Sequence, residues 1–211
     1  MTHRFELKHP LAAHHVSILR DVSTNSANFR KQIQLLAMML AVESTADLKL
    51  TDRPVETPLQ SMTGKQLAQR IAIVPILRAG LGLVDPILHL VPDAEVWHLG
   101  MYRDEETATP IEYYCKLPAD HPADIGLVLD PMLATGGSIR MAIAALKRWG
   151  VPDIRILSVI ASESGIESLH HDFPDVKIFV VTVDSELNTH KFIVPGLGDA
   201  GDRMFNTQRH S

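Results

Sequence analysis

One stretch of the sequence, residues 125–150 (IGLVLDPMLATGGSIRMAIAALKRWG), constrains the fold more than any other. It opens with a short apolar run, too short for an independent helix and suited to a buried parallel strand. Asp130 and a proline end this run, and small residues with two hydroxyl groups follow at 134–138. Apolar residues then recur at helical spacing as far as Trp149, and Gly150 is suited to end the helix. The stretch therefore predicts a strand, a glycine-rich turn and a helix.

The predicted turn has the chemistry of an anion-binding site. Unpaired backbone N–H groups converge at a helix N-terminus, and the helix dipole adds about half a positive charge there. The turn lacks the lysine-containing pattern of P-loops and the Gly-x-Gly-x-x-Gly of dinucleotide-binding folds. An ordinary strand–helix turn with Ser138 as the helix N-cap is the alternative. Asp130 favours a ligand site, because open α/β sheets bind ligands at the carboxyl ends of their strands. Its carboxylate could accept hydrogen bonds from sugar hydroxyls while the turn holds a phosphate, which predicts a ribose 5-phosphate site.

Composition sets the broad class. The chain has 211 residues and 45% hydrophobic content, enough to bury one sizeable core in one domain. Its net charge of −5 argues against nucleic acid or an anionic membrane as a partner. The single cysteine, Cys115, fits a reducing compartment, and the N-terminus shows no apolar signal segment. No apolar run approaches the roughly 18 residues of a membrane span. We therefore expect a cytoplasmic protein.

The remaining apolar runs extend the predicted sheet. Besides 125–129, buried strands are predicted at 71–77, 96–102, 154–160 and 176–183. Together they predict a doubly wound, mostly parallel five-stranded α/β sheet.

Helices are predicted at 11–21, 25–47, 81–90 and 165–171. The second of these should have Ser26 as its N-cap, with Arg20 and Arg30 as polar anchors. Residues 50–58, rich in proline and charge, are predicted to form a loop or an edge strand.

Three other segments carry functional chemistry. Arg78 follows the strand at 71–77 and could bridge two phosphoryl oxygens, although an arginine that only caps the strand end fits equally well. The polar residues after Tyr102 and the aromatic run 111–114 predict a β-hairpin flap that could close over a substrate, with Arg103 at its base. The segment 188–205 has four closely spaced Pro and Gly residues, so its backbone could read a planar base or simply form a polar turn.

These segments resemble motifs of the uracil phosphoribosyltransferase family. Residues 130–138 (DPMLATGGS) are similar to its loop for phosphoribosyl pyrophosphate (PRPP), in which proline replaces the second acid of most phosphoribosyltransferases. Residues 74–82 (VPILRAGLG) resemble its pyrophosphate loop, and YRDEET…P.EYY.KLP resembles its flexible loop. Residues 193–203 (IVPGLGDAGDR) resemble its uracil-binding loop. The N-terminal pattern HPL…ILRD…T…FR resembles an arm that serves in subunit packing.

The resemblance implies that uracil and PRPP react to give UMP and pyrophosphate, without a protein nucleophile. Asp130 and Arg103 are the implied catalytic residues, acting through position and charge. The implied PRPP contacts are Arg78, Arg103, Asp130, Pro131, Met132, Leu133, Ala134, Thr135, Gly136, Gly137, Ser138 and Asp199. The implied uracil contacts are Ile193, Gly198, Asp199 and Ala200. Mg²⁺ would arrive with PRPP, without a dedicated protein ligand. A non-proline cis peptide is also implied next to Arg78.

The expected organisation is one phosphoribosyltransferase domain over 1–211. It comprises an N-terminal helical arm (1–50), a flexible flap (102–118) and a base-binding loop (188–207). The sequence departs from the family where Lys191 and Phe192 replace the common glycine and tyrosine, and where Asn206 replaces glycine.

Several alternatives stay open at this point. A homodimer or homotetramer is expected, and regulation by GTP or UTP is undecided. A phosphoribosyltransferase for a purine or for orotate is one alternative function. A non-enzymatic, nucleotide-sensing regulator on the same fold is the other.

Overall fold

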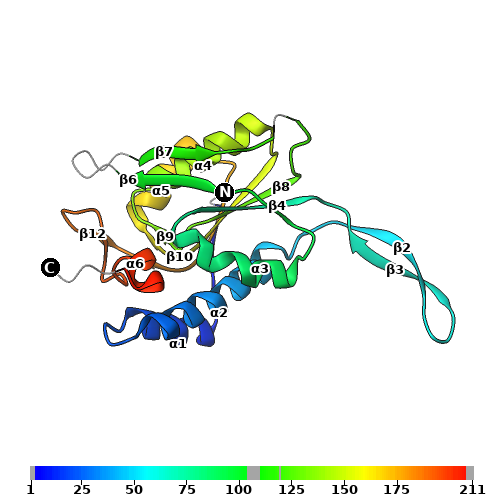
Figure 1. Cartoon of the computed structure of the whole chain (residues 1–211), viewed down its shortest axis with the longest axis horizontal. Coiled ribbons are helices and arrows are strands. Elements are labelled where there is room, and N and C mark those ends of the chain that lie inside the picture. Colours follow the sequence, from blue (N-terminus) through cyan, green and yellow to red (C-terminus); the bar gives the residue numbers. More distant parts are fainter. Residues whose placement is uncertain (1–2, 104–109, 119, 208–211) are drawn as a thin grey trace.

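A mostly parallel sheet forms the centre of the computed structural model (Figure 1), which describes residues 3–103, 110–118 and 120–207, with the backbone alone for 101–103 and 110–112. The strand order is β1-β11-β10-β8-β4-β6-β7, and only the β6–β7 pair is antiparallel. The seven strands are β1 (Arg4–Glu6), β4 (Ile71–Leu77), β6 (Leu99–Arg103), β7 (Pro110–Cys115), β8 (Ile125–Leu129), β10 (Asp153–Ser162) and β11 (Lys177–Asp184). Two short strands, β5 (Glu95–Val96) and β9 (Met132–Leu133), pair with β4 and β10. The predicted α/β class is therefore confirmed, with more strands than the five expected.

The predicted strand at 96–102 is interrupted. Its residues divide between β5 and β6, with Trp97 and His98 between the two strands. The Trp97 backbone N–H still donates to the carbonyl of Ile73 (2.9 Å), and its ring packs edge-on against Trp149. The indole thus belongs to the packing between the sheet and a helix rather than to a continuous strand.

Helices cover both faces of the sheet, and strand residues alternate between two apolar cores. Ile71 and Ile73 face the core under α1 (Pro10–Arg20), α2 (Ser26–Ser44) and α3 (Val84–Leu90). Ala72 and Val74 face the core under α4 (Gly137–Trp149) and α5 (Glu163–Asp172). Figure 1 shows these two helical layers on opposite sides of the sheet. A 3₁₀ helix, η1 (Ala79–Leu83), and a short helix, α6 (Ala200–Phe205), complete the set of helices in the described residues.

The start of α2 differs from the sequence-based expectation. Asn25, not Ser26, is the N-cap, and its side chain accepts a hydrogen bond from the backbone N–H of Asn28 (2.9 Å). Asn and Ser are about equally favoured as N-cap residues, so residue type alone could not show which of Asn25 and Ser26 begins the helix. The predicted anchors are confirmed: Arg20 pairs with Asp184, and Arg30 donates to the carbonyl oxygen of Met204 (2.6 Å).

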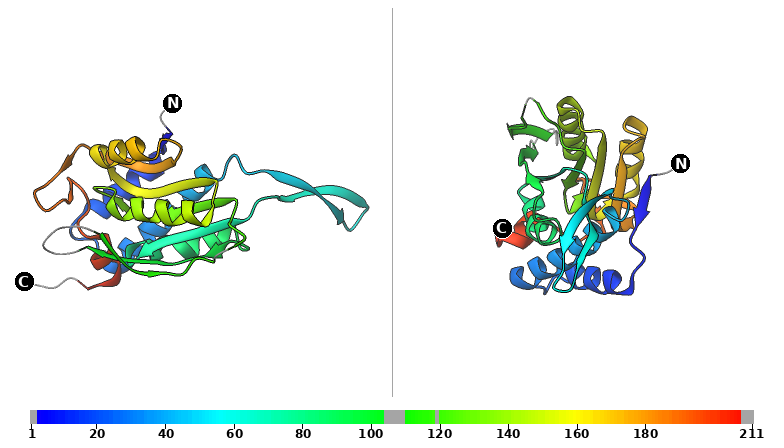
Figure 2. Two further views of the ribbon diagram at one scale, coloured as in Figure 1. Left: turned by 90° about the horizontal axis from the view of Figure 1, so that it is seen from above. Right: turned by 90° about the vertical axis from the view of Figure 1, so that its right-hand side faces the viewer.

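A two-stranded hairpin, β2 (Leu50–Glu56) and β3 (Ser61–Leu67), extends away from the rest of the molecule (Figures 1 and 2). The sequence predicted a loop or edge strand at 50–58 and no partner for it. Most of the hairpin is exposed, so it lacks the alternation of buried residues on which strand prediction depends. Its tip and flanks expose the apolar side chains of Leu50, Leu59, Met62 and Leu67.

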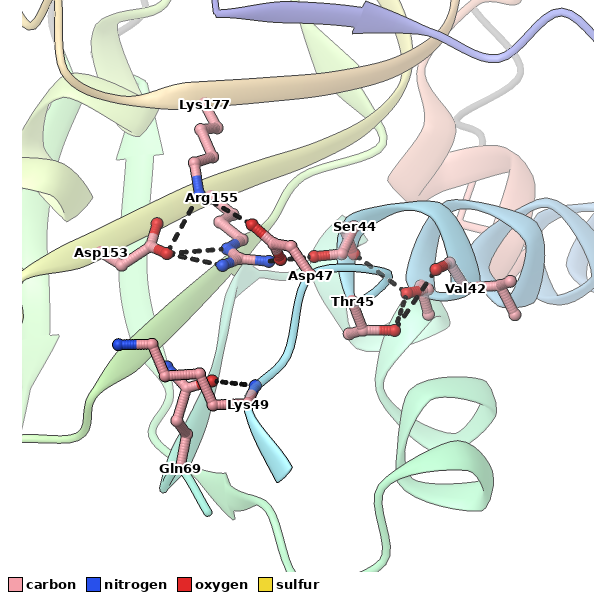
Figure 3. A network of polar contacts seen from close by, with 10 residues as sticks. Val42, Ser44, Thr45, Asp47, Lys49, Gln69, Asp153, Arg155 and Lys177 are labelled. Atoms are coloured by element: carbon pink, nitrogen blue, oxygen red, sulfur yellow. Dashed lines mark hydrogen bonds and ion pairs between the residues drawn. The ribbon is translucent and has the colours of Figure 1, made fainter. Parts of the chain in front are cut away.

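The root of the hairpin is attached to the sheet by charged side chains (Figure 3). The buried guanidinium of Arg155 donates to Asp47 and Asp153 (both 2.5 Å) and to the carbonyl oxygen of Ser44 at the end of α2. The ammonium of Lys177 bridges the same two carboxylates at 3.2 Å. This network lies where β10 and β11 begin.

The predicted hairpin after Tyr102 is confirmed by the antiparallel pairing of β6 and β7. Residues 104–109 of the predicted flap lie outside the described part of the chain, and its closure over a substrate stays a prediction. Within the residues that are described, no helix is long and apolar enough to cross a lipid bilayer.

Candidate functional site

The predicted phosphate turn lies between β8 and α4. Asp130 directly follows β8, and its carboxylate accepts a hydrogen bond from the backbone N–H of Met132 (3.2 Å). Gly136 is the N-cap of α4 in the left-handed conformation (φ +77°), which glycine adopts readily. The alternative with Ser138 as N-cap is therefore wrong. Among the described side chains none makes a capping hydrogen bond to this helix, and a small concavity lined by Asp130 and 132–139 lies at its start. This is the geometry of an anion site.

The start of α5 packs against the phosphate turn at Ala134. The Ser162 hydroxyl donates to the carbonyl oxygen of Ala134 (2.6 Å) and accepts from the backbone N–H of Gly165 (2.9 Å). A side chain at Gly165 would overlap the Ala134 carbonyl oxygen. Neither support was predicted from the sequence. Ser162 is recognisable as a helix N-cap from its residue type, but its contact with Ala134 joins positions 28 residues apart.

Arg78 lies at the carboxyl end of β4, on the neighbouring strand of the sheet. The peptide bond between Leu77 and Arg78 is cis, as the family resemblance implied. The guanidinium points toward α6, where it contacts the side chains of Asp202 (2.9 Å) and Thr207 (3.1 Å). The Arg78 side chain is 56% exposed and so remains accessible to an anionic ligand. Both residues lie in the predicted base-binding loop, but their contact with Arg78 was not predicted from the sequence.

The C-terminal loop is irregular, as predicted. After β13 (Ile193–Val194), which pairs with β12 (Glu186–Leu187), the Val194–Pro195 bond is cis, and Gly196 and Gly198 have positive φ angles (62° and 77°). Asp199 caps α6, with its Oδ1 accepting from the Asp202 N–H (2.8 Å). Ile193 and Ala200 are buried.

Two buried charged groups, which sequence reasoning did not assign to the site, hold this loop. Asp184 accepts from both terminal nitrogens of Arg20 (2.8 and 2.6 Å) and from the Gly196 N–H (3.0 Å). Burial by itself raises the pKa of Asp184, but the hydrogen bonds from Arg20 and Gly196 outweigh it and hold the pKa below its ordinary value. Arg203 donates to the carbonyl oxygens of Leu197 (2.8 Å) and of Asp21 (2.6 Å).

A cavity of about 330 Å³ joins the C-terminal loop to the phosphate turn. Its volume is typical of small-molecule sites. Its lining residues come from η1, the end of β8, β9 and the C-terminal loop. They are Ala79, Asp130, Met132, Ala134, His190, Lys191, Phe192, Asp199 and Ala200. A larger groove of about 460 Å³ lies between α2 and α3, but the phosphate turn does not contribute to it.

The structure thus brings most of the predicted site residues to one edge of the sheet. The cavity is lined by Asp130, Met132, Ala134, Asp199 and Ala200. Leu133 and residues 135–138 line the small concavity that adjoins it, whereas Pro131 lines neither. Arg78 lies beside Gly201, next to the cavity. Ile193 and Gly198 shape the loop without lining the cavity. Arg103 ends β6, and the role expected of its side chain lies outside what the structure describes.

The site offers two carboxylates to a Mg²⁺ ion carried by a ligand. Its two carboxylates, Asp130 and Asp199, offer the hard oxygen donors that this ion prefers. In the described ranges there is no group of three or more His, Cys, Asp or Glu side chains that could hold a metal by itself. An ion carried on substrate phosphates, with its remaining positions filled by water, matches this donor set.

Comparison with known proteins identifies the relatives of the chain. The family model for uracil phosphoribosyltransferase matches residues 6–207. A uracil phosphoribosyltransferase of Roseiflexus sp. (strain RS-1) is 51% identical over 95% of this chain and 96% of that protein. The uracil phosphoribosyltransferase of Clostridium novyi is 50% identical over 96% of this chain and 98% of its own length. A solved structure from Aquifex aeolicus superimposes with a TM-score of 0.93 at 36% identity, covering 98% of this chain and 100% of that one.

Proposed function

Because this chain belongs to the uracil phosphoribosyltransferase family, we propose that it transfers the 5-phosphoribosyl group of PRPP to N1 of uracil, releasing pyrophosphate and forming UMP. One observation carries the proposal at the level of residues. A single cavity joins Asp130 and the phosphate turn to the C-terminal loop at Asp199 and Ala200. A sugar phosphate and a planar base can therefore occupy adjoining parts of one site.

The phosphate turn and Asp130 hold the ribose phosphate in this proposal. The backbone N–H groups and hydroxyls of 134–138 bind the 5-phosphate, and the Asp130 carboxylate accepts from the ribose hydroxyls. Arg78, with Arg103 of the flap, binds the pyrophosphate that leaves. As the bond from ribose C1 to the pyrophosphate oxygen breaks, the bond from C1 to uracil N1 forms, and the N1 proton is released. Fixed positions and positive charge near the leaving group supply the catalysis, since no nucleophile is needed.

The C-terminal loop reads the base. Its backbone at Ile193, Gly198, Asp199 and Ala200 carries the alternating donors and acceptors that a uracil edge requires. Phe192, which stands where the family commonly has tyrosine, lines the cavity. We propose that its ring packs against the base, so that the missing hydroxyl matters little.

Asp130 and Asp199 would face a Mg²⁺ ion brought in by PRPP, and their carboxylates would accept hydrogen bonds from its water ligands. Bound there, the ion would neutralise charge on the leaving pyrophosphate.

A homo-oligomer, dimer or tetramer, is the proposed assembly. The projecting β2–β3 hairpin supports it, because its exposed apolar side chains, among them Leu59 (95% exposed), suit contact with a second copy. Light scattering that finds a monomer would contradict this assembly.

The decisive experiment is formation of nucleotide from PRPP and Mg²⁺, with uracil, hypoxanthine, orotate and no base compared side by side. UMP formed with uracil alone is the expected result. Turnover with another base would retain the phosphate site but reject the assignment of the C-terminal loop. PRPP binding without turnover of any base would indicate a nucleotide sensor instead. Further reactions with GTP or UTP test whether either nucleotide regulates the enzyme.

A further inference from the structure

The guanidinium of Arg78 is held in place by two side chains from the C-terminal end of the chain. Its Nη2 donates to Asp202 Oδ1 (2.9 Å), and its Nη1 donates to Thr207 Oγ1 (3.1 Å). The Thr207 hydroxyl in turn donates to the same Asp202 oxygen (2.7 Å). Each of these bonds uses one N–H of a terminal nitrogen. The guanidinium carries five N–H donors, so others remain for an anion.

The same contacts continue into the proposed base-binding loop. The backbone N–H of Asp202 donates to Asp199 Oδ1, and its carbonyl oxygen accepts from the Thr207 N–H (3.1 Å). Asp199 lines the cavity where the base is proposed to bind. A continuous path of hydrogen bonds therefore runs from Asp199 through Asp202 to Arg78.

We propose that Asp202 and Thr207 are positioning residues, which orient Arg78 toward the leaving pyrophosphate and couple its orientation to the base-binding loop. The inference rests on the proposed function and extends it by two residues, neither of which is assigned a contact with substrate. An arginine with a long, flexible side chain loses rotamer entropy when it binds an anion. Anchoring it in advance reduces that loss.

A contrary role for Asp202 makes the opposite prediction. If its carboxylate only competed with pyrophosphate for Arg78, removing the charge would strengthen anion binding. Asp202→Asn and Asp202→Ala separate these roles, because asparagine keeps an acceptor oxygen and alanine does not. Positioning predicts weaker pyrophosphate binding for alanine and substantial rescue by asparagine, whereas competition predicts tighter binding for both.

The experiment measures the dissociation constant of inorganic pyrophosphate with Mg²⁺ by calorimetry. Asp202→Ala and Thr207→Val should each weaken binding about three- to tenfold, a range set by the partial exposure of the pair. Asp202→Asn should stay within about threefold of wild type. The control is Asp175→Ala, which removes an exposed ion pair with Lys147 outside the site and should not change the dissociation constant.

A double-mutant cycle identifies the route of the effect. In an Arg78→Ala background, Asp202→Ala should have almost no further effect on pyrophosphate binding, because the group that it positions is gone. An equal loss in both backgrounds, or no loss in wild type, would overturn the inference. UMP formation by the wild-type protein is measured in parallel. Its absence would reject the proposed function, whereas active wild-type enzyme with an unaffected Asp202→Ala variant would reject only the positioning role.

Discussion

Gly165 faces the carbonyl oxygen of Ala134 so closely that a methyl group on its α-carbon would overlap that oxygen. Ser162 also donates to this oxygen, so the middle of the phosphate turn rests on the first turn of α5. The shape of the proposed phosphate site thus depends on a helix that does not line its concavity.

Gly165→Ala should therefore impair PRPP binding. The added methyl group displaces Ala134 and tilts the N–H groups of the turn, so we expect the KM for PRPP to rise about tenfold, with a loss of stability of about 1–3 kcal/mol from overpacking. Gly126→Ala is the control, because its methyl group would press on Leu146 and Val151 instead. Steady-state kinetics and urea unfolding of both variants distinguish the effects. A rise in KM for Gly126→Ala equal to that for Gly165→Ala would mean that general destabilisation explains the result.

The parts of the site that follow directly on a buried strand could be predicted from the sequence. β4, β8, β10 and β11 are apolar runs, and the chain becomes polar where β4 and β8 end, at Arg78 and Asp130. Parallel pairing brings these ends to one edge, so local pattern and topology together located the phosphate turn.

The supporting contacts could not be predicted in the same way. Arg20 and Asp184 are 164 positions apart, and nothing local indicates that they meet at Gly196. The pairing of β2 with β3 also escaped prediction, because the two strands pair with each other outside the core and show no periodic burial. Sequence patterns report burial, whereas these features depend on contacts between distant segments.

Asp130→Asn should weaken PRPP use while leaving the fold intact. The amide oxygen can still accept from the Met132 N–H, but the charge that serves the ribose hydroxyls is lost. We expect kcat/KM for PRPP to fall about 10- to 100-fold, the range for hydrogen bonds to a charged group. Asp124→Asn is a matched control at the other end of β8, where the carboxylate accepts from the Arg70 N–H (2.7 Å). Turnover near that of wild type for Asp130→Asn would remove this residue from the site.

Asp184 should make the stability of the C-terminal loop depend on pH. Because its folded-state pKa lies below the ordinary carboxyl value, its stabilising effect is complete above about pH 4 and disappears as pH falls through the folded pKa. Asp184→Asn should therefore be less stable than wild type by about 1–3 kcal/mol at pH 7, with the difference shrinking as the pH falls below about 4. Urea unfolding across this range measures it. The exposed pair of Lys65 and Asp52 supplies the control, since Asp52→Asn should lose less than about 1 kcal/mol at pH 7. A difference for Asp184→Asn that stays constant with pH would contradict this role.

The network around Arg155 should stabilise the fold without contributing to the chemistry (Figure 3). Burial raises the pKa of Asp153, but the hydrogen bonds from Arg155 and Lys177 outweigh it and lower the pKa overall, so the carboxylate is charged at neutral pH. The Arg155 side chain is only 3% exposed. Arg155→Met removes its guanidinium and leaves Lys177 as the ion-pair partner of both Asp47 and Asp153. We expect the free energy of unfolding to fall by about 1–3 kcal/mol, because hydrogen bonds between charged groups are lost while Lys177 still pairs with Asp153 and the exposed Asp47.

The activity of Arg155→Met should distinguish this role from a catalytic one. Arg155 lies near the start of β10, whereas the proposed phosphate site lies beyond the opposite ends of the parallel strands, so kcat and the KM for PRPP should match wild type below the unfolding temperature. Lys65→Met, which breaks an ion pair exposed on the hairpin, should cost less than about 1 kcal/mol. A stability loss for Arg155→Met as small as that of Lys65→Met would show that desolvation of the buried guanidinium cancels its ion pairs. A selective fall in kcat would instead connect the network to the site, through the α2 and β10 segments that it joins.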